Sequence, residues 1–76
     1  MNKTKRFIAQ QGSATTVKVF LAETGQLYRV IDVGTIISTP VCTESEMTVS
    51  VKGSDGKTCM KIYGIPGFNI KQSVSL

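Results

Sequence analysis

The feature of this sequence that most constrains its fold is a Gly-Ser-Asp-Gly corner, residues 53–56, between two segments of alternating apolar and polar residues. A glycine-rich corner between two such segments is a strong signal for a β-hairpin. A turn centred on Ser54–Asp55 and a turn centred on Asp55–Gly56 both predict the same division of side chains between the faces. The predicted dry face carries Met47, Val49, Val51, Thr58, Met60 and Ile62, and the predicted basic face carries Lys52, Lys57, Cys59 and Lys61.

The rest of the chain also has the composition of β-strands. The Glu23-Thr24-Gly25 segment suits a tight turn with glycine in the left-handed position. Gly34 interrupts a long β-rich segment, which predicts a corner where one strand passes between the two halves of a small barrel. Pro40 makes residues 39–45 irregular, with room for at most one helical turn. Besides the hairpin, strands are predicted over residues 5–10, 15–22, 27–38 and 68–74, with the first at a sheet edge.

No segment shows sustained helical periodicity, so the chain is predicted to be a single all-β domain over residues 1–76. We expect a small antiparallel barrel or rolled sheet of about five to six strands, SH3-like or OB-like by architectural analogy. A domain this small buries only about 60% of the surface that its unfolded chain exposes. Small domains commonly gain stability from a disulfide, a metal or a partner subunit, so oligomerisation is one expected source of stability.

The inventory of reactive side chains is poor. The chain has no histidine, and Cys42 and Cys59 lack the paired spacing of a zinc site, so no metal or cofactor is expected. Without histidine and with only five carboxylates, the chain is not expected to be an enzyme. No apolar run approaches the roughly 20 residues that span a bilayer, so we expect no membrane association and a cytoplasmic protein with reduced thiols.

Two groups of residues are candidate binding sites. Nine lysines and arginines against five acidic residues give a formal charge of +4, which favours an acidic partner. The first group is Lys52, Lys57 and Lys61 on the basic face of the hairpin, although lysines on a strand are also a common defence against aggregation. The second group is Lys18, Phe20 and Tyr28, because the turn at residues 23–25 places the two rings opposite each other. Aromatic rings beside a cation stack nucleic-acid bases in small β-barrels, but these rings equally suit a core.

Two functions from different classes follow. The first is a non-enzymatic module that binds an anionic polymer, nucleic acid above all, through Lys52, Lys57, Lys61 and the Lys18–Phe20–Tyr28 face. The alternative is a protein-interaction or inhibitor module that uses a sheet edge or an exposed apolar patch, in one form as a homodimer. A thiol function of Cys59, which lies between Lys57 and Lys61 on the basic face, is a minor alternative.

Overall fold

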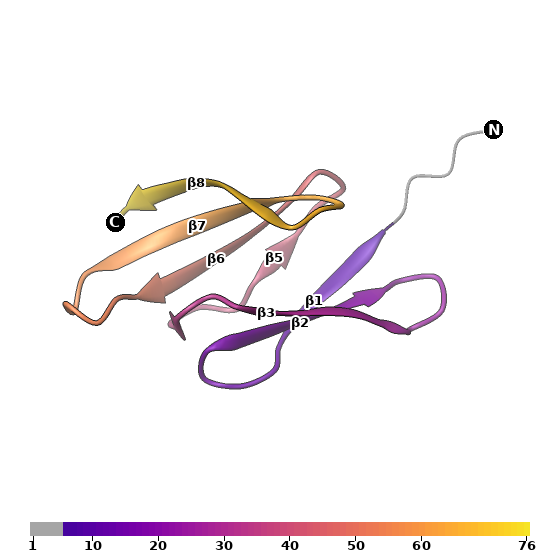
Figure 1. The fold of residues 1–76 in the computed structure, drawn as a ribbon, viewed down its shortest axis with the longest axis horizontal. Coiled ribbons are helices and arrows are strands. Elements are labelled where there is room, and N and C mark those ends of the chain that lie inside the picture. The colour runs from indigo at the N-terminus through magenta and orange to yellow at the C-terminus, as the bar shows by residue number, and fades with distance from the viewer. Residues whose placement is uncertain (1–5) are drawn as a thin grey trace.

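The structure of the protein is a computed structural model that describes residues 6–76, which fold into antiparallel β-strands (Figure 1). The predicted all-β character is confirmed, and Lys5, the predicted start of the first strand, lies outside the described residues. Eight strands follow one another: β1 (Phe7–Gln11), β2 (Thr16–Leu21), β3 (Leu27–Asp32), β4 (Thr35–Ile36), β5 (Val41–Cys42), β6 (Glu46–Lys52), β7 (Thr58–Gly64) and β8 (Asn69–Ser75).

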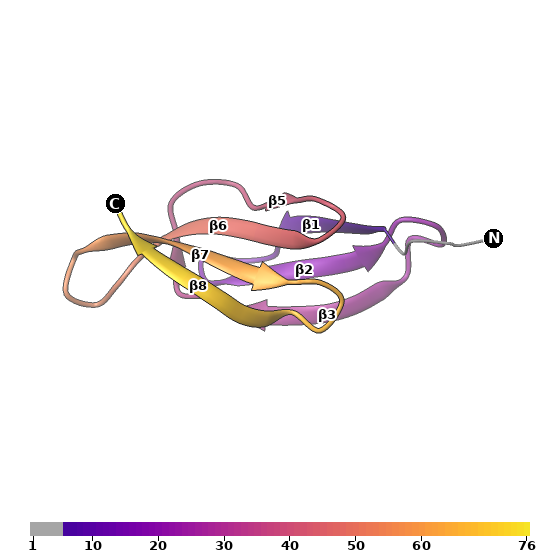
Figure 2. The ribbon, with the colours of Figure 1, turned by 90° about the horizontal axis from the view of Figure 1, so that it is seen from above.

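The strands form two sheets that face each other. The first has the order β1-β2-β3, and the second has the order β4-β6-β7-β8, with β5 also paired to β6. In both views β1 and β5 lie side by side and run in opposite directions (Figures 1 and 2). Within residues 6–76 no hydrogen-bonded ladder joins the two sheets, so the predicted closed barrel is not confirmed. The predicted place of the first strand at a sheet edge is confirmed, since β1 pairs only with β2.

The chain passes from the first sheet to the second at Gly34, as the sequence predicted. Gly34 separates β3 from β4 and has a φ of +100°, a conformation that side chains rarely adopt. Two hydrogen bonds hold this crossover against the β1–β2 connection, from Val33 N to Thr15 O at 2.9 Å and from Ile36 N to Ala14 O at 2.9 Å. The corner is therefore a fixed link between the two layers.

The β2–β3 turn and the segment of residues 39–45 are each shaped by a residue within them. The β2–β3 turn has Gly25 at a φ of +76°, which confirms the glycine-dependent turn predicted there. Residues 39–45 contain the short edge strand β5 and no helical turn, which is compatible with the predicted irregular segment. The Thr43 hydroxyl accepts hydrogen bonds from Ser45 N at 3.4 Å and Glu46 N at 3.2 Å, which closes the turn between β5 and β6.

The core lies between the sheets and draws on both. Strand β2 contributes Val17 and Val19, and strand β6 contributes Met47 and Val49. In each strand the fully buried residues are two apart, as the pleat of a β-strand requires for one face. The buried apolar residues are Phe7, Val17, Val19, Val33, Met47, Val49, Val51, Tyr63 and Phe68.

Candidate anion-binding site

The β6–β7 hairpin has a register that is centred on Asp55 itself. Lys52 lies opposite Thr58, and Gly53 N donates to Lys57 O at 2.8 Å across the base of the loop. Inside the loop, Asp55 Oδ1 accepts from Lys57 N at 3.0 Å, and Gly56 has a φ of +83°. The carboxylate and the positive φ at glycine together fix a loop over residues 53–57.

This register corrects the predicted faces of the hairpin. The β6 half is confirmed, because Met47, Val49 and Val51 are all buried. The β7 half was wrong, because both predicted turns differ by one residue in register from the observed one, and such a shift exchanges the two faces of a strand. The side chains that share the inner face with β6 are Cys59, Lys61 and Tyr63, while Thr58, Met60 and Ile62 lie on the outer face.

The three predicted hairpin lysines nevertheless meet at one cavity, although not on one strand face. Lys52, Lys57 and Lys61 line a cavity of about 280 Å³ at the loop end of the hairpin; we call it the lysine cavity. Its opposite wall comes from the crossover at Val33 and Gly34. Lys61 is half-buried, and its ammonium group donates to Val33 O at 2.9 Å. Lys52 and Lys57 are not directly opposed across the ladder, because Lys52 lies opposite Thr58.

The charge around the lysine cavity is unbalanced. Asp55 supplies the only carboxylate among the described lining residues, and one of its oxygens accepts a backbone N–H. Within residues 6–76 the one salt bridge is between Lys71 Nζ and Glu46 Oε2 at 3.6 Å, which involves none of the lysines in this cavity. The cavity therefore carries more positive than negative charge, and an anion bound there would reduce this imbalance.

The predicted Lys18–Phe20–Tyr28 face is not formed. The β2–β3 register shifts between Val19 and Phe20, so that Phe20 lies opposite Leu27 and not Tyr28. Lys18 and Phe20 remain on the same outer face of the first sheet, since they are two residues apart in β2. An irregularity of this kind re-aims the side chains beside it, and the sequence carried no glycine or proline to mark its position.

Tyr28 belongs instead to an aromatic cluster at the end of the two sheets. Its ring centroid lies 4.8 Å from that of Phe7 and 6.0 Å from that of Phe68. Its hydroxyl donates to Pro66 O at 3.3 Å, and the neighbouring Arg29 donates from Nη1 to Gly67 O at 2.7 Å. These contacts join β3 to the β7–β8 turn, so the Tyr28 ring contributes to packing between the two sheets.

The two thiols are free and lie at different cavities. Cys59 lines the lysine cavity, and Cys42 lies on β5, where burial raises the pKa of its thiol above the ordinary value. Within the described part of the chain, no three histidine, cysteine or acidic side chains come close enough to hold a metal ion.

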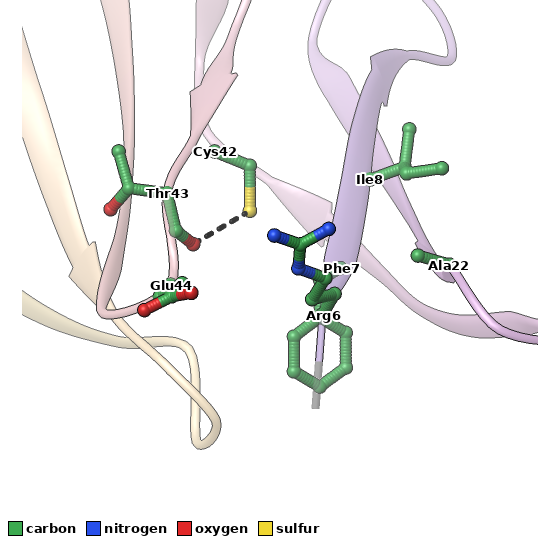
Figure 3. A pocket seen from close by; sticks show the side chains of 7 residues that line it. All are labelled: Arg6, Phe7, Ile8, Ala22, Cys42, Thr43 and Glu44. Carbon is green, nitrogen blue, oxygen red and sulfur yellow. Dashed lines mark hydrogen bonds between the residues drawn. The ribbon is translucent and has the colours of Figure 1, made fainter. Parts of the chain in front are cut away.

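The sequence pointed to the hairpin lysines but missed the second wall of their cavity. Val33 and Gly34 lie far from the hairpin in sequence, and Gly34 was recognised only as a corner. The sequence also gave no sign of a second cavity, which lies between β1 and β5 and is lined by Arg6, Cys42 and Glu44 among others (Figure 3). Both cavities depend on which strand ends meet in space, which pattern alone does not determine.

The geometry defines a small all-β domain with a lysine-lined cavity at one end. Comparison with protein-family models, with curated proteins and with solved structures finds no match to this chain. In the described residues, no helix has the length and apolar character needed to cross a membrane.

Proposed function

We propose that this protein is a non-enzymatic binding module for an anionic polymer, nucleic acid above all, and that Lys52, Lys57 and Lys61 form its contact site. The observation that carries the proposal is that these three lysines line one cavity with a single carboxylate beside them. Phosphate groups are the repeated charge of nucleic acids, and lysine binds phosphate as a compact point charge with three donors.

The size of the lysine cavity also favours this ligand. A volume of about 280 Å³ can accept a phosphate group with its adjoining sugar, but it is below the range of most drug-sized ligand pockets. Lys18 and Phe20, on the outer face of the first sheet, are the second candidate contact. Because Tyr28 packs with Phe7 and Phe68, base stacking between Phe20 and Tyr28 is no longer part of the proposal.

The proposal is tested by measuring the affinity of a fluorescent single-stranded oligonucleotide by anisotropy while the salt concentration is raised. The variant Lys52→Gln/Lys57→Gln removes two cavity lysines and keeps Lys61, which the fold itself uses. We expect it to weaken binding by about tenfold or more, or about 1.4 kcal/mol. The slope of log affinity against log salt should fall by about 0.7 for each lysine that contacts a phosphate.

The matched control is Lys3→Gln/Lys5→Gln, which removes the same charge outside the hairpin and outside the Lys18–Phe20 contact. A loss confined to the cavity variant supports the proposal. An equal loss in both variants would show that net charge alone attracts the polymer, without a site at the hairpin. Undetectable binding of single- and double-stranded DNA and RNA by the unaltered protein at low salt would remove the proposal entirely.

A further inference from the structure

The last strand, β8, forms a free edge of the second sheet. Among the described strands, β7 is its only hydrogen-bonded neighbour. In Figure 1 the C-terminal half of β8 lies on the far side of the second sheet, with β7 and β6 between it and the first sheet. Every residue of this strand except Val74 is exposed. Another strand can therefore be added beside the C-terminal half of β8.

The outward backbone groups of β8 belong to two serines. Leu76 N donates to Thr58 O at 3.1 Å, so position 76 directs its backbone N–H toward β7. In an antiparallel ladder, alternate residues direct their N–H and C=O groups to opposite sides of the strand. The pairing with β7 is regular from position 72 to position 75. Ser73 and Ser75 consequently direct their backbone groups away from β7.

The C-terminal half of β8 lacks the usual protection of a sheet edge. Proteins commonly protect such an edge with a charged residue, a proline or a bulge. The bulge of β8 lies at Lys71, and the ammonium group of this residue lies 3.6 Å from Glu46 Oε2 of its own sheet. Residues 72–75 contain no charge, no proline and no bulge. The edge strand of the first sheet, β3, differs, because two of its side chains are bound to the β7–β8 turn.

The sequence of this edge is complementary to a second copy of itself. Two antiparallel β8 strands with a two-fold axis at Ser73 place this residue opposite Ser73 of the second copy. The same register places Gln72 opposite Val74 of the second copy, and Lys71 opposite Ser75 of the second copy. No like charges are opposed, and the outward groups of Ser73 and Ser75 fall at hydrogen-bonded positions of the new ladder.

This pairing also brings two lysine cavities together. Ser75 lines the lysine cavity and lies opposite Cys59, on the inner face of the second sheet. The two-fold axis of an antiparallel pair is perpendicular to the sheet, so both cavities lie on the same side of the joined sheet. The two copies of Ser75 are then four positions apart, or about 14 Å along the strands.

We propose that β8 pairs with β8 of a second copy about a two-fold axis at Ser73, and that one anionic polymer spans the two lysine cavities. The strand pairing stands by itself, whereas the polymer step rests on the function proposed above. A pairing limited to residues 71–75 is smaller than the standard interface of about 800 Å² per partner, so the dimer alone should be weak. A polymer bound to both copies raises their effective concentration, so polymer and dimer should stabilise each other.

The pairing is tested by disulfide cross-linking without nucleic acid, in a Cys42→Ser/Cys59→Ser background. Ser73→Cys places two thiols at the two-fold axis, where opposed Cα atoms are about 5.5 Å apart and a disulfide can form. Ser75→Cys is the matched control, because its two thiols are about 14 Å apart along the strands. Mild oxidation should cross-link the first variant at least about tenfold faster than the second. Equal rates, a faster reaction at position 75, or no cross-linking of either variant would overturn the pairing.

Sedimentation tests the same pairing with the native cysteines in place. Ser73→Pro removes an outward N–H at the two-fold axis, which an edge strand tolerates, whereas Ser73→Ala keeps it. The unaltered protein and Ser73→Ala should show a concentration-dependent equilibrium of monomer and dimer, and Ser73→Pro should stay a monomer. A monomeric unaltered protein at every concentration, or a Ser73→Pro variant that dimerises equally well, contradicts the proposal.

The polymer step is tested with fluorescent oligothymidylates of about 3 and about 12 nucleotides, of which only the longer can span both cavities. The unaltered protein should bind the longer probe about tenfold more tightly than Ser73→Pro does, and both proteins should bind the shorter probe equally. Equal affinity of both proteins for the longer probe refutes the joined site. Lys52→Gln/Lys57→Gln should dimerise normally and lose both probes. If it binds both probes as the unaltered protein does, the function of the lysine cavity fails, while cross-linking still decides the pairing.

Discussion

The observed register of the hairpin can be tested with two identical substitutions, Met47→Ala and Met60→Ala. Met47 is 0% exposed between the sheets, whereas Met60 is half-buried on the outer face of the second sheet. Truncation of Met47 removes roughly three methylene-sized groups at about 0.8 kcal/mol each. A further cost for the cavity left behind brings the expected loss to about 3 kcal/mol. We expect Met60→Ala to cost less, about 1 kcal/mol, because part of its side chain already contacts water and no cavity is left between the sheets.

Such a loss is large for this chain. A domain of 76 residues has about 4–11 kcal/mol of stability in total. In a thermal melt, Met47→Ala should lower Tm by about 12–24 °C, since each kcal/mol shifts a domain of this size by about 4–8 °C. Urea unfolding of both variants gives the free energies directly. If Met60→Ala were as costly as Met47→Ala, Met60 would face the core. The two faces of β7 would then be exchanged, and the observed register would be wrong by one residue.

Three further predictions concern other parts of the structure. Gly34→Ala should cost more than about 1 kcal/mol. Its Cβ would lie 3.9 Å from Val51 Cβ, which is an ordinary contact, but an alanine at a φ of +100° is strained. Gly64→Ala should cost less in the same urea titration, because its Cβ would closely meet only the flexible side chain of Lys71. Burial, and then the negative charges of Asp32 and Cys59, raise the pKa of Tyr63, so its contribution to stability should be level below pH about 10 and fall above it, and Tyr63→Phe should remove that part of the fall. Because burial raises the pKa of Cys42, iodoacetamide should label Cys42 in the folded protein more slowly than in urea at the same pH, and equal rates would contradict its burial.

Features that depend on one residue's backbone were predictable from the sequence. The turn at Gly25 and the corner at Gly34 both rest on positive φ, a property that glycine supplies at low cost. The edge position of β1 was also predictable, since the Gln11-Gly12-Ser13 segment ends the strand early. Each of these inferences needed only the local conformation of the chain.

Features that depend on a count of residues between strands were not predictable. The faces of β7 depend on whether the loop centre falls on a residue or between two residues, and a corner with glycines at both ends accepts either. In the first sheet, the irregularity beside Phe20 moved Tyr28 to the cluster with Phe7 and Phe68. In both cases a shift of one residue in pairing changed the face on which a candidate site residue lies.

The inward position of Lys61 has a structural reason, because its ammonium group satisfies a carbonyl group at the crossover. Val33 is 1% exposed at the crossover, and its carbonyl has left the first sheet before the chain joins the second. A buried carbonyl without a partner costs about 1–3 kcal/mol, and Lys61 Nζ satisfies this one at 2.9 Å. The aliphatic stem of the lysine covers apolar surface on the way.

In the proposed function, the same contact leaves Lys61 able to bind an anion. An ammonium group has three donors, and the bond to Val33 O uses one of them. An anion in the lysine cavity can therefore bind Lys61 without breaking the crossover, and Lys61 loses little conformational entropy because the fold already holds it. Lys52 and Lys57 are exposed and must be ordered when the anion binds. Affinity in this site should thus come from one fixed and two mobile cations, with the fixed one supplied by the residue that completes the corner at Gly34.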